Sequence, residues 1–476
     1  MQDSIREKAI SSLFGSYFAQ FAQIGIRLFL SILLARILLP KDFGLFAIAF
    51  MILNIAKIVM QLGLGQHIIR EDKVNYAALF SLECAAGFFV FILLQIINPY
   101  LAVYNIALPS VNRVLSFALI PYCLSIVPTV YGYKELKLRE MIIPNLLHGV
   151  SFSVGAILLA LKGLGVWALV YSHLISEAVF AYACWKTVGR FTPISFRFKL
   201  KEVFMFVLGA RYFYIIALFG IFAANADKML LGKLVSLQDI GYYSVAATLS
   251  MYVVNLIEPS LNNVFYPIFS KIKADISKTK EFYASATIVL YWFEIPIYLF
   301  LVFNADIVIR LMLGLKWLPA VSIFRVLAVI PIINPCWTFG FQIIQAHSKE
   351  KIQFYFNVLY FVLLVPIGYF AIMRWGVMGI AYTQLLLQGV IYVLLYFANK
   401  ITRNVLSVWL SLLPIYLVGL VGFALIYILF KIRYFAFLAS LLYTAMIYIF
   451  FYNKNIKKIV KEKFADVAIF KRLRIV

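Results

Sequence analysis

Acidic residues are scarce in this chain of 476 residues, where 20 aspartates and glutamates stand against 43 lysines and arginines. Charged residues of both signs make up only 13% of the sequence, whereas hydrophobic residues make up 64%. So low a charge content excludes a soluble globular protein, and no polar stretch is long enough for a domain outside the membrane. The composition therefore predicts a protein that lies almost entirely within a lipid bilayer.

Cysteine and histidine are also rare, at four residues each. The cysteines lie far apart in apolar segments and the histidines show no metal-ligand spacing, so we expect no disulfide framework, no metal and no cofactor. The net charge of +23 is not concentrated on a soluble face, which argues against nucleic acid as a partner. A polar start at 1–8 leads into an apolar run without a small-residue cleavage site, and this predicts a retained first helix.

Long apolar segments predict about fourteen transmembrane helices in an all-α polytopic membrane protein. The expected spans are 9–35, 43–65, 76–97, 111–132, 141–161, 166–185, 203–226, 241–266, 282–304, 318–345, 352–373, 376–398, 406–430 and 433–452. Most lysines and arginines outside these spans fall in the loops on the side of the N-terminus and in the basic tail. By the positive-inside rule, both termini are expected in the cytoplasm.

The sequence repeats once. Residues 34–46 (LARILLPKDFGLF) align without gaps on 231–243 (LGKLVSLQDIGYY), and we call these two stretches the repeat segments. Residues 165–173 align similarly on 376–384, so six helices form the repeated unit. Because six is even, the two bundles should be related by a pseudo-two-fold axis along the membrane normal, with a substrate site between them.

This repeat predicts three parts of the chain. They are an N-terminal six-helix bundle at 1–195, a C-terminal six-helix bundle at 196–400, and two extra transmembrane helices with a basic cytoplasmic tail at 401–476. The basic loop at 186–201 is the expected linker between the two bundles.

Several charged side chains lie inside the apolar spans, including Arg27, Lys57 and Arg211. A charge at the middle of a bilayer costs about 2.5–3.5 kcal/mol even on the lenient insertion scale. A polar cavity enclosed by helices would lower this cost, and it is the expected arrangement for a transport protein. Arg325 lies near the end of its span, so we expect it to reach the membrane interface by snorkelling.

Three helices carry polar residues at the spacing i, i+3, i+7, which places them on one helix face. The three stripes are Gln20, Gln23 and Arg27; Asn54, Lys57 and Gln61; and Asn255, Glu258 and Asn262. We expect these residues to line the cavity, and the alternative is interhelical hydrogen bonding within the bundle.

Other polar residues inside the spans have less specific expectations. Asp227 and Lys228 form a gating or structural pair near the outer end of the seventh span. Glu294, like Glu258, either neutralises an intramembrane cation or titrates during the transport cycle. The polar residues of the fifth and sixth spans are expected to be helix-packing groups, with proton relays as the alternative: His148, His173 and Glu177.

The motifs of the chain resemble those of the polysaccharide transporter family. The resemblance rests on LARILLPKDFG at 34–44, QLGLG at 61–65 and the pair Asp227-Lys228, in a frame of six plus six plus two spans. The family comprises Wzx/WzxC-like lipid-linked oligosaccharide flippases and belongs to the multidrug/oligosaccharidyl-lipid/polysaccharide exporter superfamily. The resemblance covers essentially the whole chain.

This resemblance implies a flippase that moves undecaprenyl-diphosphate-linked oligosaccharide from the cytoplasmic to the periplasmic leaflet of a bacterial inner membrane, for O-antigen, capsule or exopolysaccharide synthesis. It also implies membrane lipids, a polysaccharide polymerase and a chain-length regulator as partners. In such flippases, cations of the first, second, seventh and eighth helices line the cavity. Arg27, Lys57 and Arg211 match three of these helices, but the eighth span carries no cation there.

Two alternatives remain open. A multidrug exporter of the same superfamily would share the fold, although those exporters have twelve spans and usually handle organic cations, which match a basic interior poorly. A membrane polysaccharide polymerase or ligase would be an enzyme, and such an enzyme is expected to carry a sizeable external loop with catalytic residues. The external loops here are short and hold no such motif, so we expect no enzyme.

Overall fold

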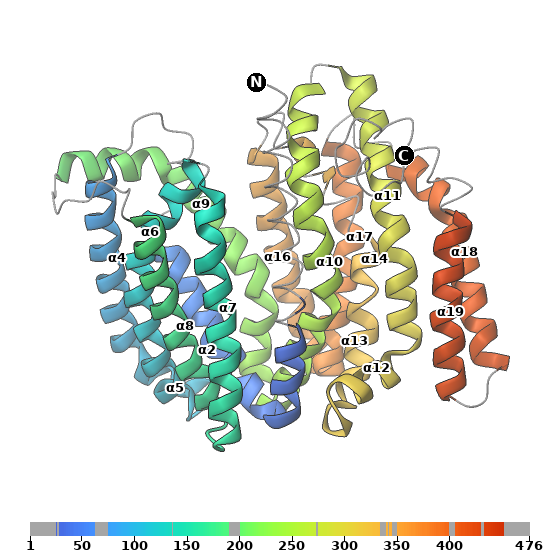
Figure 1. Cartoon of the computed structure of the whole chain (residues 1–476), viewed down its shortest axis with the longest axis horizontal. Coiled ribbons are helices and arrows are strands. Elements are labelled where there is room, and N and C mark those ends of the chain that lie inside the picture. Colours follow the sequence, from blue (N-terminus) through green and yellow to red (C-terminus); the bar gives the residue numbers. More distant parts are fainter. Residues whose placement is uncertain are drawn as a thin grey trace. The chain divides into compact units, whose positions relative to one another are not determined.

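A computed structural model describes most of the chain. The described residues are 25, 28–61, 75–135, 137–189, 200–272, 275–333, 339–340, 342–344, 350–398, 405–429 and 433–451. Every element in these ranges is a helix (Figure 1). This agrees with the bilayer environment, because a helix satisfies its backbone hydrogen bonds internally where no water is present.

Helices of the first part of the described chain are α2 (Pro40–Gln61), α4 (Tyr76–Ile97), η1 (Asn98–Val103), α5 (Leu108–Leu115), η2 (Ser116–Ala118), α6 (Leu119–Lys134), α7 (Leu138–Leu161), α8 (Val166–Thr187), α9 (Leu200–Leu234) and α10 (Leu237–Ile272). Those of the second part are α11 (Ile276–Phe303), α12 (Ala305–Met312), η4 (Leu315–Trp317), α13 (Ala320–Leu327), α14 (Ile330–Ile333), α16 (Glu350–Trp375), α17 (Val377–Ala398), α18 (Val405–Leu429) and α19 (Arg433–Phe451).

The expected membrane spans are confirmed. Within the described residues, 10 helical stretches are long and apolar enough to cross a bilayer. Shorter apolar helices occur at Leu28–Ile37, Ala320–Ile333, Val377–Val390 and Arg433–Ile449. Each of these stretches overlaps one of the spans expected from the sequence. The protein is therefore an all-α, multi-span membrane protein.

The chain divides into two compact units, unit 1 at Met1–Ser244 and unit 2 at Val245–Val476. The boundary falls inside α10, beyond the basic loop where the repeat places the linker. One reason is that α9 packs along α2 and so groups with unit 1. The three-part division expected from the repeat stays a prediction.

Unit 1 is built around the antiparallel pair α7 and α8, which pack along their length (Figure 1). The turn between them contains Gly163 and Gly165 at φ values of 77° and 55°. This left-handed region is costly for other residues, so glycine permits the chain to reverse within a few residues. Helix α6 then packs against both α8 and α4.

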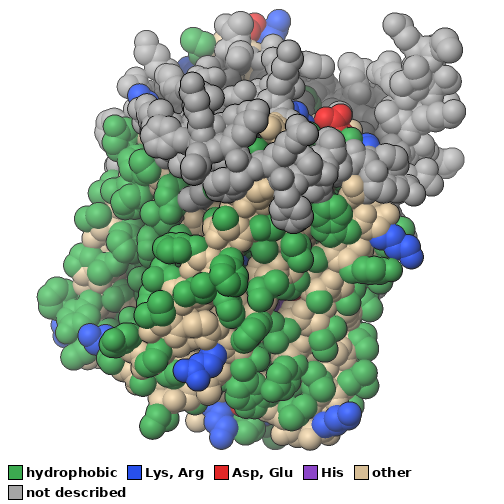
Figure 2. All heavy atoms as spheres, turned by 90° about the vertical axis from the view of Figure 1, so that its left-hand side faces the viewer, with side chains coloured by type: hydrophobic (Ala, Val, Ile, Leu, Met, Phe, Trp, Pro, Cys, Tyr) green, Lys and Arg blue, Asp and Glu red, His purple; other side chains and the backbone are tan. Residues whose placement is uncertain are grey.

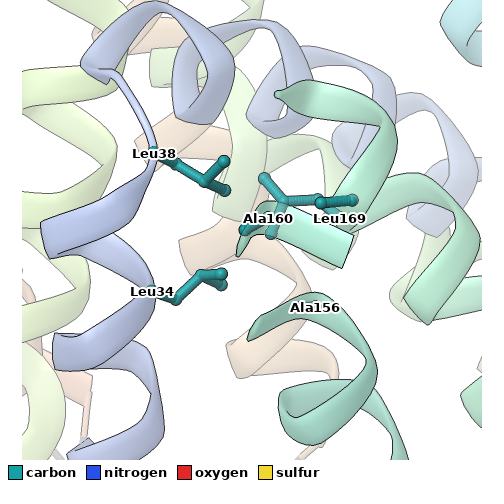
Figure 3. Close-up of a cluster of buried hydrophobic side chains, with 6 residues drawn as sticks. Leu34, Leu38, Ala156, Ala160 and Leu169 are labelled. Carbon is teal, nitrogen blue, oxygen red and sulfur yellow. The ribbon is translucent and has the colours of Figure 1, made fainter. Parts of the chain in front are cut away.

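A small apolar cluster joins the segment 28–37 to this pair of helices (Figure 3). Leu34 and Leu38 face Ala156, Ala160 and Leu169, and all five side chains are buried. Lipid tails are as apolar as leucine, so burial from water does not drive this contact. The alanines instead let the helices approach closely, and van der Waals packing provides the stabilisation.

The two repeat segments meet each other within unit 1. A Cβ added to Gly44 would collide with the carbonyl oxygen of Leu237, and one added to Gly241 would collide with that of Pro40. Pro40 corresponds to Leu237 in the repeat, and Gly44 to Gly241. The contact is therefore two-fold symmetric, and each glycine lets the partner helix touch its backbone.

An aspartate at the same place in each repeat segment stabilises a helix start. The Leu39 amide donates to Asp42 Oδ2 at 3.1 Å. At the matching place, Ser236 Oγ lies 2.7 Å from Asp239 Oδ2, and the Asp239 amide donates to Ser236 Oγ at 3.2 Å. These are capping contacts that satisfy backbone groups left over at a helix N-terminus. The shared aspartate and glycine thus have separate physical roles.

The side of unit 1 seen in Figure 2 is covered by hydrophobic side chains, with lysines and arginines near its lower edge. On α4, the large side chains Phe88, Phe89 and Ile96 are exposed. An apolar surface this wide is characteristic of a protein that contacts lipid tails.

Unit 2 packs α18 and α19 against α11, and α16 against α17. Tyrosine hydroxyls from the two last helices donate to backbone carbonyls of the neighbouring helices. Tyr416 donates to Ile332 at 2.9 Å, Tyr448 to Phe293 at 2.5 Å, and Tyr427 to Phe303. These bonds attach the two extra C-terminal helices to the rest of the unit.

Arg325 is partly exposed on α13, with 46% of its side chain accessible, and its Nη2 lies 3.5 Å from Asp306 Oδ1. Asp306 Oδ2 also accepts from Arg433 Nη1 at 2.6 Å, at the start of α19. Arg325 therefore forms an ion pair that the sequence did not indicate, and its snorkelling to the membrane interface stays a prediction.

Candidate functional site

The centre of unit 1 contains a buried ion pair. Lys57 Nζ on α2 lies 2.7 Å from Glu177 Oε1 on α8, and the two side chains are 11% and 5% exposed. A hydrogen-bonded pair of opposite charges greatly reduces the cost of placing either charge in an apolar interior. Lys57 and Glu177 are thus each other's counter-ion in unit 1.

Two histidines approach the same carboxylate oxygen. His173 Nε2 lies 3.4 Å and His148 Nε2 3.7 Å from Glu177 Oε1. His173 is one turn before Glu177 on α8, whereas His148 belongs to α7. The His173 ring also packs edge-on against the Phe50 ring, with 5.1 Å between the ring centroids. Nitrogens from three helices therefore converge on one carboxylate.

A fourth helix joins through Tyr122 of α6. Lys57 Nζ lies 4.4 Å from the centre of the Tyr122 ring, and Gln61 Nε2 donates to the Tyr122 hydroxyl at 2.5 Å. A cation near an aromatic face is stabilised by the ring quadrupole. We call Lys57, Gln61, Tyr122, His148, His173 and Glu177 the Lys57 cluster.

Glu83 on α4 lies close to this cluster. It is only 1% exposed, and neither carboxyl oxygen has a hydrogen-bond partner within the described part of the chain. Both Glu83 and Glu177 act electrostatically on the Tyr122 hydroxyl. A buried carboxyl group without a hydrogen-bond partner is rare in proteins and calls for an explanation.

The Lys57 cluster is suited to holding charge and protons rather than a metal ion. The described residues contain no group of three or more histidines, cysteines, aspartates or glutamates that fits a metal. The lysine ammonium lies against the Glu177 oxygen that the histidines also approach, so it occupies the electrostatic position that a metal cation would need.

The structure places the remaining expected site residues in different surroundings. Asn54 and Gln61 are partly buried on α2, and Asn255 is exposed on α10. Asp227 accepts from the Tyr243 hydroxyl at 2.6 Å, which connects α9 to α10. Lys228, which follows Asp227 in the chain, is partly buried.

Glu294 is fully buried on α11 in unit 2. It lies near enough to Tyr448 on α19 to act on its hydroxyl electrostatically. The expected role of Glu294 in gating or coupling of transport stays a prediction.

Other expected residues lie outside the described part of the structure. This applies to Gln20, Gln23 and Arg27, and to the side chains of Arg211, Glu258 and Asn262, whose helical backbones are described. Convergence of the three polar stripes on one cavity therefore stays a prediction.

Sequence reasoning missed the partner of Lys57. It assigned neutralisation of the cations to Glu258 or Glu294 and treated His148, His173 and Glu177 as packing groups. The structure instead joins Lys57 with these three residues. A signal was present, because His173 and Glu177 are four residues apart and so share one face of an apolar helix.

Comparison with known proteins places this architecture in a family. Residues 33–322 match the family described as "Polysaccharide biosynthesis protein". Teichuronic acid biosynthesis protein TuaB of Bacillus subtilis is 25% identical over 63% of this chain, and the match spans only 64% of TuaB. Lipopolysaccharide biosynthesis protein WzxC of Escherichia coli is 22% identical over 87% of this chain and 86% of its own length.

Solved structures show the same fold. The lipid II flippase MurJ, in an inward closed conformation, superposes with a TM-score of 0.78 at 15% identity, over 92% of this chain and 98% of MurJ. An inward-facing multidrug resistance transporter of the MATE family gives a TM-score of 0.62 at 15% identity, over 81% of this chain and 96% of its own. The match over 33–322 includes the repeat segments and the Lys57 cluster, and the chain belongs to the polysaccharide biosynthesis protein family.

Proposed function

We propose that this protein is a flippase that moves undecaprenyl-diphosphate-linked oligosaccharide from the cytoplasmic to the outer leaflet of a bacterial inner membrane. The proposal rests above all on the family match, in a multi-span fold whose apolar helices carry cations. The names of TuaB and WzxC support a role in polysaccharide synthesis, and the fold shared with the lipid II flippase MurJ is compatible with moving a lipid-linked head group. Both termini would lie in the cytoplasm, as the basic loops indicate.

The physical task is to carry a charged, hydrated head group across about 30 Å of hydrocarbon. The polyprenyl tail can stay in lipid throughout, so the protein needs to solvate only the diphosphate and the sugars. A charge pair at 4 Å gains about 1 kcal/mol in water but about 4 kcal/mol at an effective dielectric constant near 20. Cations that line a polar cavity would therefore be effective ligands for the diphosphate.

Arg27 and Arg211 are the preferred diphosphate ligands, because a planar guanidinium binds a phosphate through two parallel hydrogen bonds. Lys57 is engaged by Glu177 at 2.7 Å. It would contact the diphosphate only after this ion pair opens. Neutral stripe residues such as Asn54 and Asn255 would bind sugar hydroxyls.

Lipid transfer in reconstituted vesicles tests the proposal. We expect the wild-type protein to move a labelled undecaprenyl-diphosphate oligosaccharide between leaflets, and Arg211→Gln and Arg27→Gln each to slow this by about tenfold or more. Loss of only about 1.4 kcal/mol of binding free energy already gives a tenfold change. Arg113→Gln, at an exposed position on α5, is the matched control and should retain the wild-type rate.

Three results would revise the proposal. Normal transfer by both arginine variants would leave the flippase but remove these two residues as diphosphate ligands. Absence of transfer across several glycan types would contradict the flippase itself. Transport of organic cations by the same vesicles would instead favour a multidrug exporter, which the likeness to the MATE fold permits. The polymerase and chain-length regulator remain proposed partners, which co-purification would test.

A further inference from the structure

Glu83 is a buried carboxyl group of unit 1 that takes no part in the ion pair of the Lys57 cluster, so this pair does not explain its protonation state. It lies about two turns into the membrane-crossing helix α4, which begins at Tyr76, and it is almost completely buried. Neither oxygen meets a hydrogen-bond donor in the described part of the chain. The charged form of such a carboxyl group is strongly disfavoured, because its loss of hydration is not compensated.

The charges around Glu83 lead to the same conclusion. Lys57 is the cation of this region, and its ammonium is already hydrogen-bonded to Glu177 at 2.7 Å. The charge of Lys57 is thus already balanced by Glu177. If both carboxyl groups were ionised, the cluster would hold an uncompensated negative charge inside the membrane, whereas one bound proton makes it neutral.

The titratable neighbours of Glu83 do not supply another cation. Cys84 on α4 interacts electrostatically with Glu83, and so do Tyr122 and Cys123 on α6. The buried charged group of α2 is Lys57, which pairs with Glu177. The other elements packed against α4, which are η1, η2 and α9, contribute no charge interaction with Glu83 among the described residues.

We propose that Glu83 is a proton-binding site of unit 1, and that its ligand is a single proton held at neutral pH. The proton is held because an ionised Glu83 would be buried without a hydrogen-bond donor among the described residues, while the charge of Lys57 on the neighbouring helix α2 is balanced by Glu177. Any step that separates Lys57 from Glu177 frees the ammonium to stabilise an ionised Glu83 and frees Glu177 to accept a proton. One proton then leaves Glu83 and one binds at Glu177 or a neighbouring histidine, so the charge of the cluster is unchanged.

This site gives the proposed flippase a means of responding to protons. A step of the transport cycle that opens the Lys57–Glu177 pair would release the proton of Glu83, and Glu177 or a neighbouring histidine would take one up. This second part rests on the proposed function, whereas the protonation of Glu83 does not.

Infrared spectroscopy of the full-length protein in lipid nanodiscs tests the proton site without any transport assay. A protonated carboxyl group has a carbonyl band that shifts in heavy water. We expect wild type at neutral pH to show such a band and Glu83→Gln and Glu83→Met to lose it. Glu135→Gln, at an exposed position after α6, should retain it. An unchanged band in both Glu83 variants would overturn the proposal.

The stability of the same variants gives a second test. Glutamine resembles a neutral carboxylic acid in shape, so we expect Glu83→Gln to unfold at the wild-type temperature, and Glu83→Met to remain folded. Strong destabilisation of both would mean that Glu83 is ionised and paired, which contradicts the proposal.

Lipid transfer measured against pH then tests the coupling. We expect Glu83→Gln to keep transferring lipid with a flattened pH dependence. A full pH dependence in a variant that has lost the infrared band would remove Glu83 from the coupling. Failure of wild-type transfer would count against the flippase and leave the infrared result standing, so the two proposals can fail separately.

Discussion

Unit 1 and unit 2 satisfy their buried polar groups in different ways. In unit 1 the interior contains a lysine, two glutamates and two histidines on four different helices. In unit 2 the described ion pairs lie near helix ends, as at Asp306 and Arg433, and tyrosine hydroxyls bonded to carbonyls connect the helices. Unit 1 therefore buries a cluster of titratable groups, whereas the described helices of unit 2 are joined largely by neutral hydrogen bonds and bury the carboxyl group of Glu294.

This difference indicates that the buried polar groups of the two units have different physical roles. A buried ion pair adds little net stability relative to well-packed apolar residues, so stability alone does not account for the Lys57 cluster. Intramembrane ionisable groups are more often functional. Neutral hydrogen bonds between helices, by contrast, fix their arrangement without responding to protons or anionic ligands. The predictions below test this contrast between the units.

The largest effect is expected from breaking the ion pair of unit 1. Lys57→Met leaves Glu177 buried without its cation, and we expect a loss of about 3–5 kcal/mol in unfolding free energy. Adding Glu177→Met should recover most of that loss, because the double variant replaces both charges with apolar groups. Thermal unfolding in detergent measures both. Simply additive losses would show that the pair is not a coupled unit.

The next effect concerns the contact of the repeat segments. Gly44→Ala places a Cβ against the Leu237 carbonyl, so the two helices must separate, at a cost of about 1–3 kcal/mol. The matched control lies in unit 2, where Gly389 on α17 has nothing within 4 Å of an added Cβ. Gly389→Ala should be neutral in the same unfolding assay. Equal behaviour of the two variants would contradict the tight crossing in unit 1.

A smaller effect is expected for the neutral bonds of unit 2. Tyr416→Phe removes the hydroxyl that donates to the Ile332 carbonyl, and we expect a cost of about 0.5–1.5 kcal/mol with no change in the pH dependence of unfolding. Tyr382→Phe, at an exposed tyrosine of α17, should change nothing. A pH-dependent loss of unfolding free energy in Tyr416→Phe would contradict the difference between the units.

The smallest effect is expected at the edge of unit 2. Arg433 is 73% exposed in its pair with Asp306, so Arg433→Gln should cost about 0.2–1 kcal/mol, and less at high salt. Arg310→Gln, at an exposed position of α12, serves as the control. A loss as large as that of Lys57→Met would mean that unit 2 also depends on a strong ion pair.

The membrane class, the apolar spans and the repeat all follow from the amino-acid sequence alone. Each of these features depends on residues that are close together in the sequence, since a bilayer requires a long apolar run for every crossing. The repeat segments even carried the glycines and aspartates that the structure uses for a helix crossing and for helix starts. The sequence motifs likewise predicted the family that the comparisons confirm.

Which polar groups meet becomes visible only in the folded chain. Lys57 and Glu177 are 120 residues apart, and helical periodicity states which face of its own helix a residue occupies but not which helix lies opposite. That is why the sequence predicted glutamate partners for the intramembrane cations but did not single out Glu177. The isolation of Glu83 was equally hidden, because a missing partner becomes visible only after all neighbouring helices are in place.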